Sequence, residues 1–228
     1  MQLQHQELVE SLARQHDEDF ALLHADLREA LPEVASRWAD RFPNAADMSG
    51  HNRCTAVRQT LLSMFDGRGE RPFSLLDARE GPGLSVVLSD GSGTRIRVRR
   101  WPTDNLKRRI RVVDVPPSGQ SEALAEARQL ALDEGHEELV LPRSAGGPFD
   151  VFVLWWADDD EVELAGAELA AVADIDSSSV VRILATAPLP APEPVRAEPP
   201  AADPGPHGDF DEFDEFDDVA GTGDITPA

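Results

Sequence analysis

The stretch that decides the fold is residues 84–101, LSVVLSDGSGTRIRVRRW. Apolar residues alternate with small or charged ones on both sides of the turn sequence DGSG at 90–93. A period of two is typical of β-strands with one buried face, and a short Gly-rich turn joins antiparallel strands. The stretch therefore predicts a β-hairpin whose second strand has Ile96 and Val98 on one face and arginines on the other.

The chain on the C-terminal side of this hairpin predicts more strands and one helix. Alternation indicates a strand at 109–115, which Pro116 and Pro117 end. The run VFVLWWA at 151–157 is apolar on both faces, which is typical of a central strand buried on both sides. The other expected elements are a helix at 118–134, a short strand at 138–141 and strands at 168–175 and 180–186.

The chain on the N-terminal side of the hairpin predicts helices. Apolar residues at helical spacing indicate a long helix at 4–30, with His16 filling one position of its apolar stripe. Pro32 is expected to interrupt it and to begin a second helix that ends near Phe42. A third helix is expected at 52–65.

These elements predict an α+β fold, because strands and helices do not alternate as they do in a doubly wound sheet. We expect a helical region at 1–66, then a region at 67–187 with a mostly antiparallel sheet and one packed helix. Half of the 18 prolines lie from Pro188 onward. Such a segment buries too little apolar surface to fold, so 188–228 is expected to be a disordered Pro-rich linker and acidic tail.

The charge and the cysteine content of the chain limit which cellular compartment and which partners can be expected. The formal net charge is −22, and an acidic chain is repelled by nucleic acid and anionic membranes unless its basic residues cluster. No apolar run approaches the roughly 20 residues of a membrane helix. The N-terminus lacks a signal-peptide pattern, and Cys54 is the single cysteine. We therefore expect a cytoplasmic protein that does not bind membranes.

Basic residues do cluster at one place in the chain. Eight of the 21 basic residues lie between Arg95 and Arg111. If the two strands of this segment pair antiparallel, one sheet face collects five arginines. The candidates for anion binding are Arg95, Arg97, Arg99, Arg109 and Arg111. Two interpretations stay open: a surface for nucleic acid, phosphate or an acidic peptide, or a solvated face on which each arginine pairs with a carboxylate.

The C-terminal tail contains an acidic-aromatic segment at 209–218, DFDEFDEFDD. Phe210, Phe213 and Phe216 recur at every third position among seven acids, so the acids keep the segment soluble while each ring can enter a pocket. Two interpretations stay open, a docking segment for a partner protein and a solubilising tail. Docking is favoured because a tail that only increases solubility does not require regularly spaced phenylalanines.

Catalytic and metal-binding motifs are missing from the chain. The six histidines form no H-x-x-x-H pair, and there is neither a phosphate-binding loop nor a nucleophile elbow. We therefore expect no cofactor, no metal and no catalytic residues. An enzyme of unrecognised type stays open as a third alternative, with Glu80, Asp114 or Asp150 in a cleft between the helices and the sheet.

The sequence favours a non-catalytic regulatory or adaptor protein that acts through protein–protein contacts and docks a partner with its tail. The alternative is a nucleic-acid-binding regulator that uses the basic strands at 95–111. The apolar stripe of the N-terminal helix offers either a core contact or a homodimer seam. In both cases His16 is expected to be a satisfied interface histidine and not a ligand.

Overall fold

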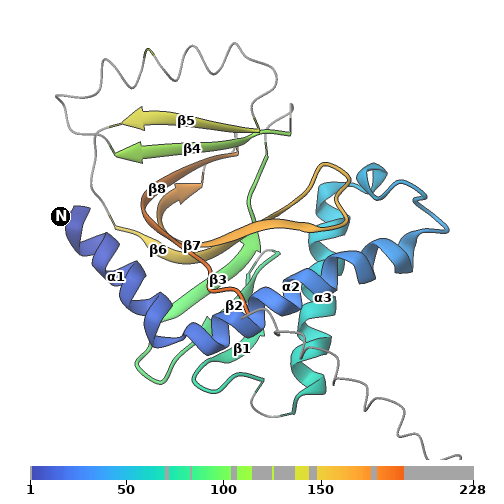
Figure 1. The fold of residues 1–228 in the computed structure, drawn as a ribbon, viewed down its shortest axis with the longest axis horizontal. Helices are drawn as coiled ribbons and strands as arrows, with labels where there is room; N and C mark the ends of the chain where they lie inside the picture. Colours follow the sequence, from blue (N-terminus) through green and yellow to red (C-terminus); the bar gives the residue numbers. More distant parts are fainter. Residues whose placement is uncertain are drawn as a thin grey trace, which may run out of the picture. The chain divides into compact units, whose positions relative to one another are not determined.

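A computed structural model describes residues 2–69, 72–82, 84–103, 107–114, 125, 137–143, 148–175 and 179–192. Contacts divide the chain into two units, Met1–Pro192 and Glu193–Ala228, and all of the described residues lie in the first. They form an α+β fold, as the sequence predicts (Figure 1). In the described part of the chain, no helix has the length and apolar character needed to cross a membrane.

The N-terminal helices differ in their boundaries from the prediction. They are α1 (Gln2–Gln15), α2 (Asp17–Trp38) and α3 (Gly50–Gly67), with the short 3-10 helix η1 (Ala45–Asp47) before α3. The break falls at His16, and Pro32 lies inside α2, so the predicted boundary at Pro32 is wrong. Three acids at Asp17, Glu18 and Asp19 begin α2, where carboxylates stabilise the positive end of the helix dipole.

Helix α3 is confirmed, with one more turn than predicted. Ser49 caps its start by accepting a hydrogen bond from the backbone N–H of Asn52 at 3.3 Å. Val57, Leu61 and Phe65 recur at a spacing of four and are all buried. The apolar stripe of α3 therefore faces the core, as its periodicity predicts.

The sheet of the described residues has eight strands in the order β1-β2-β3-β6-β7-β8-β4-β5. The strands are β1 (Asp77–Glu80), β2 (Val86–Ser89), β3 (Arg95–Arg100), β4 (Arg109–Asp114), β5 (Glu138–Arg143), β6 (Asp150–Ala157), β7 (Leu164–Ile175) and β8 (Val180–Pro188). The pairs β3–β6, β4–β8 and β4–β5 are parallel, and the other four are antiparallel.

The central strands match their sequence patterns. Strands β2 and β3 form the predicted hairpin, in which Val86 pairs with Val98. Strand β6 lies between β3 and β7 and is buried along most of its length, as its doubly apolar sequence predicts. The predicted helix at 118–134 lies outside the described residues except at Ala125, and the docking segment at 209–218 lies wholly outside them.

The two faces of the sheet bury different side chains. One face packs against α1, α2 and α3 around a large core that includes Phe20, Leu27 and Val153. The other face holds a smaller buried cluster with Trp101, Phe152 and other residues of β6, β7 and β8. Because alternate side chains of a strand point to opposite faces, β6 supplies both clusters.

The sheet is strongly curled, and this curl was not expected from the sequence. Strand β4 is four strand positions from β3, about 19 Å in a flat sheet. The guanidinium of Arg111 on β4 nevertheless lies 4.9 Å from the ring of Trp101, directly after β3. Register shifts at Trp156/Ala157 and between Ala171 and Asp174 place bulges in the intervening strands, where they increase bending and twist.

Candidate functional site

The five candidate arginines lie on two strands that are not neighbours in the sheet. Strand β4 pairs with β8 and β5, so the antiparallel pairing of the two basic strands, which was the condition for a shared five-arginine face, does not form. A strand's partner is chosen by packing over the whole chain, and here β6, β7 and β8 fit between the two basic strands. The register still puts the arginines of both strands on the face that holds Trp101.

Strand β3 carries the arginine row, which we define as Arg95, Arg97 and Arg99. Ile96 and Val98, between them, are buried against the helices. Arg97 has 42% of its side chain exposed and lies 3.6 Å from Asp150, itself 62% exposed. Ion pairs this exposed contribute little to stability, because solvent screens them. Arg97 also lies over the ring of Phe152, 5.7 Å from its centroid, so it is half-exposed and has only a weak carboxylate partner.

Arg99 is a partly buried member of the arginine row that has no carboxylate partner among the described residues. No hydrogen bond or ion pair joins it to any other described residue. Burial lowers the pKa of its guanidinium, and the charge of Arg97 lowers it further, although Cys54 acts in the opposite direction. A partly desolvated cation without a carboxylate gains more from an incoming anion than a solvated one does.

Strand β4 carries the β4 arginine pair, Arg109 and Arg111, which is already compensated within the chain. Arg111 donates a hydrogen bond to Glu168 at 3.0 Å, and its Nε lies 2.7 Å from Glu138 but out of line for a hydrogen bond. Arg109 lies 3.5 Å from Glu138 and 4.0 Å above the ring of Trp156. The β4 arginine pair is thus neutralised by carboxylates and stacked on tryptophan rings.

Burial shifts the protonation equilibria of this cluster. The pKa of Glu168 lies above its ordinary value because burial disfavours its charge, although the cation of Arg111 opposes the shift. The pKa of Arg109 lies below its ordinary value for the same reason, against the attraction of Glu138. Sequence analysis missed Glu138 and Glu168 as partners. A lone acid within the apolar strand sequence AGAELAAVA was the available signal for Glu168.

A second group of buried charges joins α3 to the end of β3. Glu161 accepts ion pairs from Arg53 at 3.0 Å and from Arg100. Arg53 also donates hydrogen bonds to the backbone carbonyls of Ala45 and Met48. All three charged side chains are largely buried, so they hold the helices against the sheet edge and are not available to a ligand.

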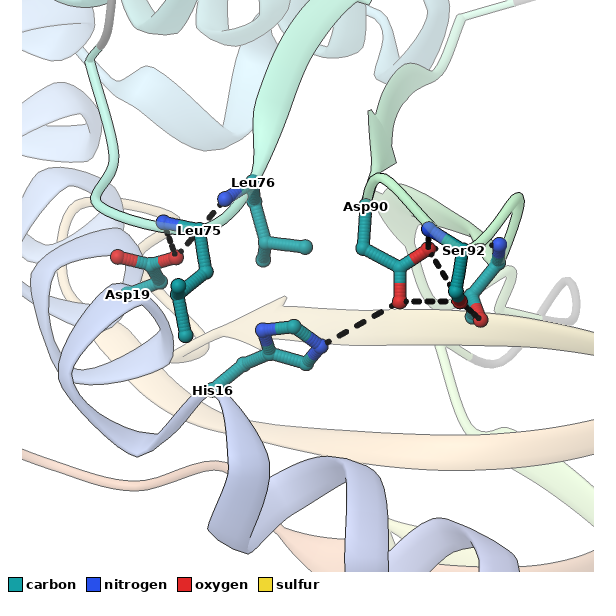
Figure 2. A network of polar contacts seen from close by, with 7 residues as sticks. His16, Asp19, Leu75, Leu76, Asp90 and Ser92 are labelled. Carbon is teal, nitrogen blue, oxygen red and sulfur yellow. Dashed lines mark hydrogen bonds and ion pairs between the residues drawn. The ribbon is translucent and has the colours of Figure 1, made fainter.

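The junction of α1 and α2 brings together a third polar network (Figure 2). Asp19 accepts backbone hydrogen bonds from Ser74, Leu75 and Leu76 at 2.8–3.0 Å. His16 is 2% exposed, and its Nε2 lies 3.7 Å from Asp90. Among the described residues, neither ring nitrogen of His16 has a hydrogen-bond partner, so the expectation of a satisfied histidine is wrong.

The carboxylates considered for an unrecognised enzyme come from different strands of the sheet. Glu80 on β1 lies 3.0 Å from Arg58, and Asp150 on β6 pairs with Arg97. Asp114 belongs to β4, several strands away. Among the residues that the structure describes, no group of three His, Cys, Asp or Glu side chains could hold a metal ion.

The tail candidates Phe210, Phe213 and Phe216 lie outside the described residues, so docking through them stays a prediction. Within the described unit, the arginine row is the candidate binding surface, and the β4 arginine pair belongs to the internal packing. Comparisons with protein-family models, with curated proteins and with solved structures found no match to this chain.

Proposed function

We propose that this chain is a non-catalytic regulatory or adaptor protein that acts through protein–protein contacts, and that its arginine row receives an acidic segment. The observation that carries the proposal is Arg99, a partly desolvated guanidinium without a carboxylate partner among the described residues. Arg97 adds an exposed cation two residues away on the same face. Carboxylates of a bound peptide would supply the missing charge and accept paired N–H donors.

The acidic-aromatic segment at 209–218 is the second part of the proposal. Its composition suits docking to a partner, with the acids directing the encounter and Phe210, Phe213 and Phe216 entering pockets. The same composition makes this segment a competitor for any surface that binds acidic ligands. A synthetic peptide of residues 209–218 is therefore a suitable probe of the arginine row.

Nucleic-acid binding is the second candidate, and the exposed guanidinium of Arg97 favours it. Two observations count against it. Glu138 and Glu168 neutralise the β4 arginine pair, which leaves three arginines for phosphates. The formal charge of the chain is also strongly negative, at −22. Three phosphate contacts would give a salt dependence with a logarithmic slope of only about −3.

The experiment measures binding of two probes to the chain truncated after Pro192, which keeps the buried Leu189. The probes are a labelled peptide of residues 209–218 and a labelled DNA duplex, both titrated at the same ionic strength. We expect the peptide to bind, and the double variant Arg97→Ala/Arg99→Ala to weaken it by about tenfold. Arg37→Ala, which removes an exposed helix cation paired with Glu33, is the matched control.

Each result decides between the candidates. Peptide binding that depends on Arg97 and Arg99 but not on Arg37 supports the protein-contact proposal. DNA binding with the same dependence, together with no peptide binding, replaces it with the second candidate. If neither probe binds at low salt, both uses of the arginine row are wrong.

A further inference from the structure

Strand β5 (Glu138–Arg143) forms one edge of the sheet, and β4 is its single neighbour among the described strands (Figure 1). On the outer side of an edge strand, backbone N–H and C=O groups are left without a strand to pair with. Val140, at the middle of β5, is an apolar residue that is 40% exposed. This edge therefore combines unpaired main-chain groups with exposed apolar surface.

The pairing of β5 with β4 determines which main-chain groups of β5 face outward. Arg109 donates its backbone N–H to the carbonyl of Glu137 at 2.8 Å, and the parallel register places Arg109 beside Glu138 and Arg111 beside Val140. In such a ladder, alternate residues of a strand direct both main-chain groups to the same neighbour. Glu137 and every second residue after it face β4, so the N–H and C=O groups of Glu138 and Val140 point away from it.

Pro142 occupies the next outward-facing position of β5. It lies beside Val113 in the register, two residues after Val140. Because proline has no N–H, it removes no bond to β4 at this position, and its carbonyl remains an outward-facing acceptor. The outer edge therefore offers the N–H and C=O groups of Glu138 and Val140, followed by the C=O of Pro142.

The opposite edge of the sheet, β1, has the features of a protected edge. Its sequence is DARE, so three of its four residues are charged, and Glu80 pairs with Arg58 of α3 at 3.0 Å. Charged side chains on an edge strand hinder its pairing with a further strand. The β5 edge has an apolar residue at its centre instead, so β5 is the edge that is suited to accept another strand.

The sequence of this edge is complementary to itself in the antiparallel direction. When Val140 of one copy lies opposite Val140 of a second copy, Glu138 lies opposite Pro142 and Glu137 lies opposite Arg143. The two valines then exchange two hydrogen bonds, and each Glu138 N–H donates to the Pro142 carbonyl of the other copy. An acid lies opposite a base at both ends, which favours this pairing. The adjacent registers, with Glu138 opposite Val140 or Val140 opposite Pro142, bring no acid opposite a base.

We propose that β5 is a homodimer interface, in which the β5 strands of two copies pair antiparallel about Val140. The contact is made by the same residues of both copies, so it closes after two copies. It covers the exposed Val140 with its counterpart and continues the sheet from one copy into the other. Because one strand pair is a small contact, the dimer is reversible. This proposal does not depend on the arginine row, and it uses a surface other than the apolar stripe of the N-terminal helix.

The first test measures the mass of the full-length chain by sedimentation equilibrium. Salt at about 150 mM screens the repulsion between copies that each carry a net charge of −22. We expect dimers above roughly 100 µM chain. Val140→Pro removes the N–H that each copy donates at the centre, without removing a bond to β4, and should leave monomers. Val140→Thr keeps this N–H and the β-branch, and should dimerise as the wild type does. A wild type that stays monomeric, or a dimer that Val140→Pro does not weaken, would overturn the proposal.

Charge reversal tests the register and does not depend on how well a proline variant folds. Glu137→Arg and Arg143→Glu each place like charges opposite one another at both ends, so each variant alone should dimerise about tenfold more weakly. An equal mixture of the two restores both acid–base pairs, so native mass spectrometry should show mainly heterodimers. Glu7→Arg, which reverses an exposed charge on α1, is the control and should dimerise as the wild type does. A mixture that forms no more dimer than either variant alone would show that this pairing is wrong.

Discussion

The arginine row on β3 and the β4 arginine pair have similar sequences, RIRVRR and RIRVVD, yet their arginines have different surroundings. Arg111 contacts two carboxylates and a tryptophan ring, whereas Arg97 lies near one exposed carboxylate and over the ring of Phe152, and 42% of its side chain is exposed. The difference comes from the neighbours. Strand β4 lies beside β5, which carries Glu138, and its side chains reach Glu168 of β7 across the curled face.

This comparison shows that a run of basic residues is not by itself a binding surface. The same residue type in the same strand pattern becomes internal packing on β4 and remains available on β3. The two strands differ in whether a carboxylate of the folded chain already pairs with each guanidinium.

Replacing Arg111 should destabilise the protein most. Arg111→Met removes the cation between Glu138 and Glu168 and leaves both carboxylates partly buried without it. The expected loss is about 3 kcal/mol in the free energy of unfolding, the range seen when one partner of a buried pair is removed. Urea denaturation followed by circular dichroism measures it. A loss below about 1 kcal/mol, typical of exposed pairs, would place Arg111 in the same class as Arg97.

Filling the space behind Trp156 should have the next largest effect. A Cβ at Gly166 would lie 2.3 Å from Cζ2 of Trp156, the ring on which Arg109 stacks. Gly166→Ala should therefore cost about 2 kcal/mol, because the tryptophan must move in a packed cluster. The control is Gly91→Ala, where nothing lies within 4 Å of the added atom. Thermal unfolding of both variants should separate them, and equal melting temperatures would contradict the tight packing.

Glu168 should give the cluster a pH dependence that the arginine row lacks. Its folded pKa lies above the ordinary carboxyl value, so the folded protein keeps a proton that the unfolded chain releases. Its contribution to stability therefore falls as pH rises from the ordinary carboxyl pKa to the folded one. In Glu168→Gln this component is absent, so the stability of the wild type relative to the variant should decline across that window. Denaturation at a series of pH values measures it, and a rising difference would contradict the direction of the shift.

Replacing Arg97 should change stability least. Arg97→Met, the same substitution as at Arg111, removes a half-exposed guanidinium whose neighbours are the exposed Asp150 and the ring of Phe152. Stability should change by less than about 0.5 kcal/mol, as is usual for surface positions. The same denaturation measurement applies. A loss comparable with that of Arg111→Met would show that the arginine row is also part of the internal packing.

Most helices and strands were predictable because local periodicity reports which residues face the core. The hairpin, β6 and α3 follow directly from alternation, from the apolar run and from the helical stripe. The predicted helix boundary was wrong because the three acids after His16 mark the break between the helices, and Pro32 does not. One proline inside a long helix is tolerated when packing supports the turns on both sides, and α2 buries residues before and after it.

The candidate site was predictable only in part. Alternation placed Arg95, Arg97 and Arg99 on one sheet face, and the register bears this out. The alternation in the basic strands did not indicate that Glu138 and Glu168 would pair with Arg111, because they lie 27 and 57 residues from it in sequence. The unsatisfied ring of His16 was also invisible, because hydrogen bonding depends on the positions of Asp90 and the 74–76 segment.

Local sequence patterns are sufficient to predict the type of each central element, the buried face of the hairpin and the alternation of arginines along β3. Those features depend on interactions between residues a few positions apart, which periodicity records. The tertiary structure alone decided the strand order, the curl of the sheet and the arginines that are neutralised. Those features depend on contacts between distant segments, and a short pattern does not encode which distant carboxylate meets a given guanidinium.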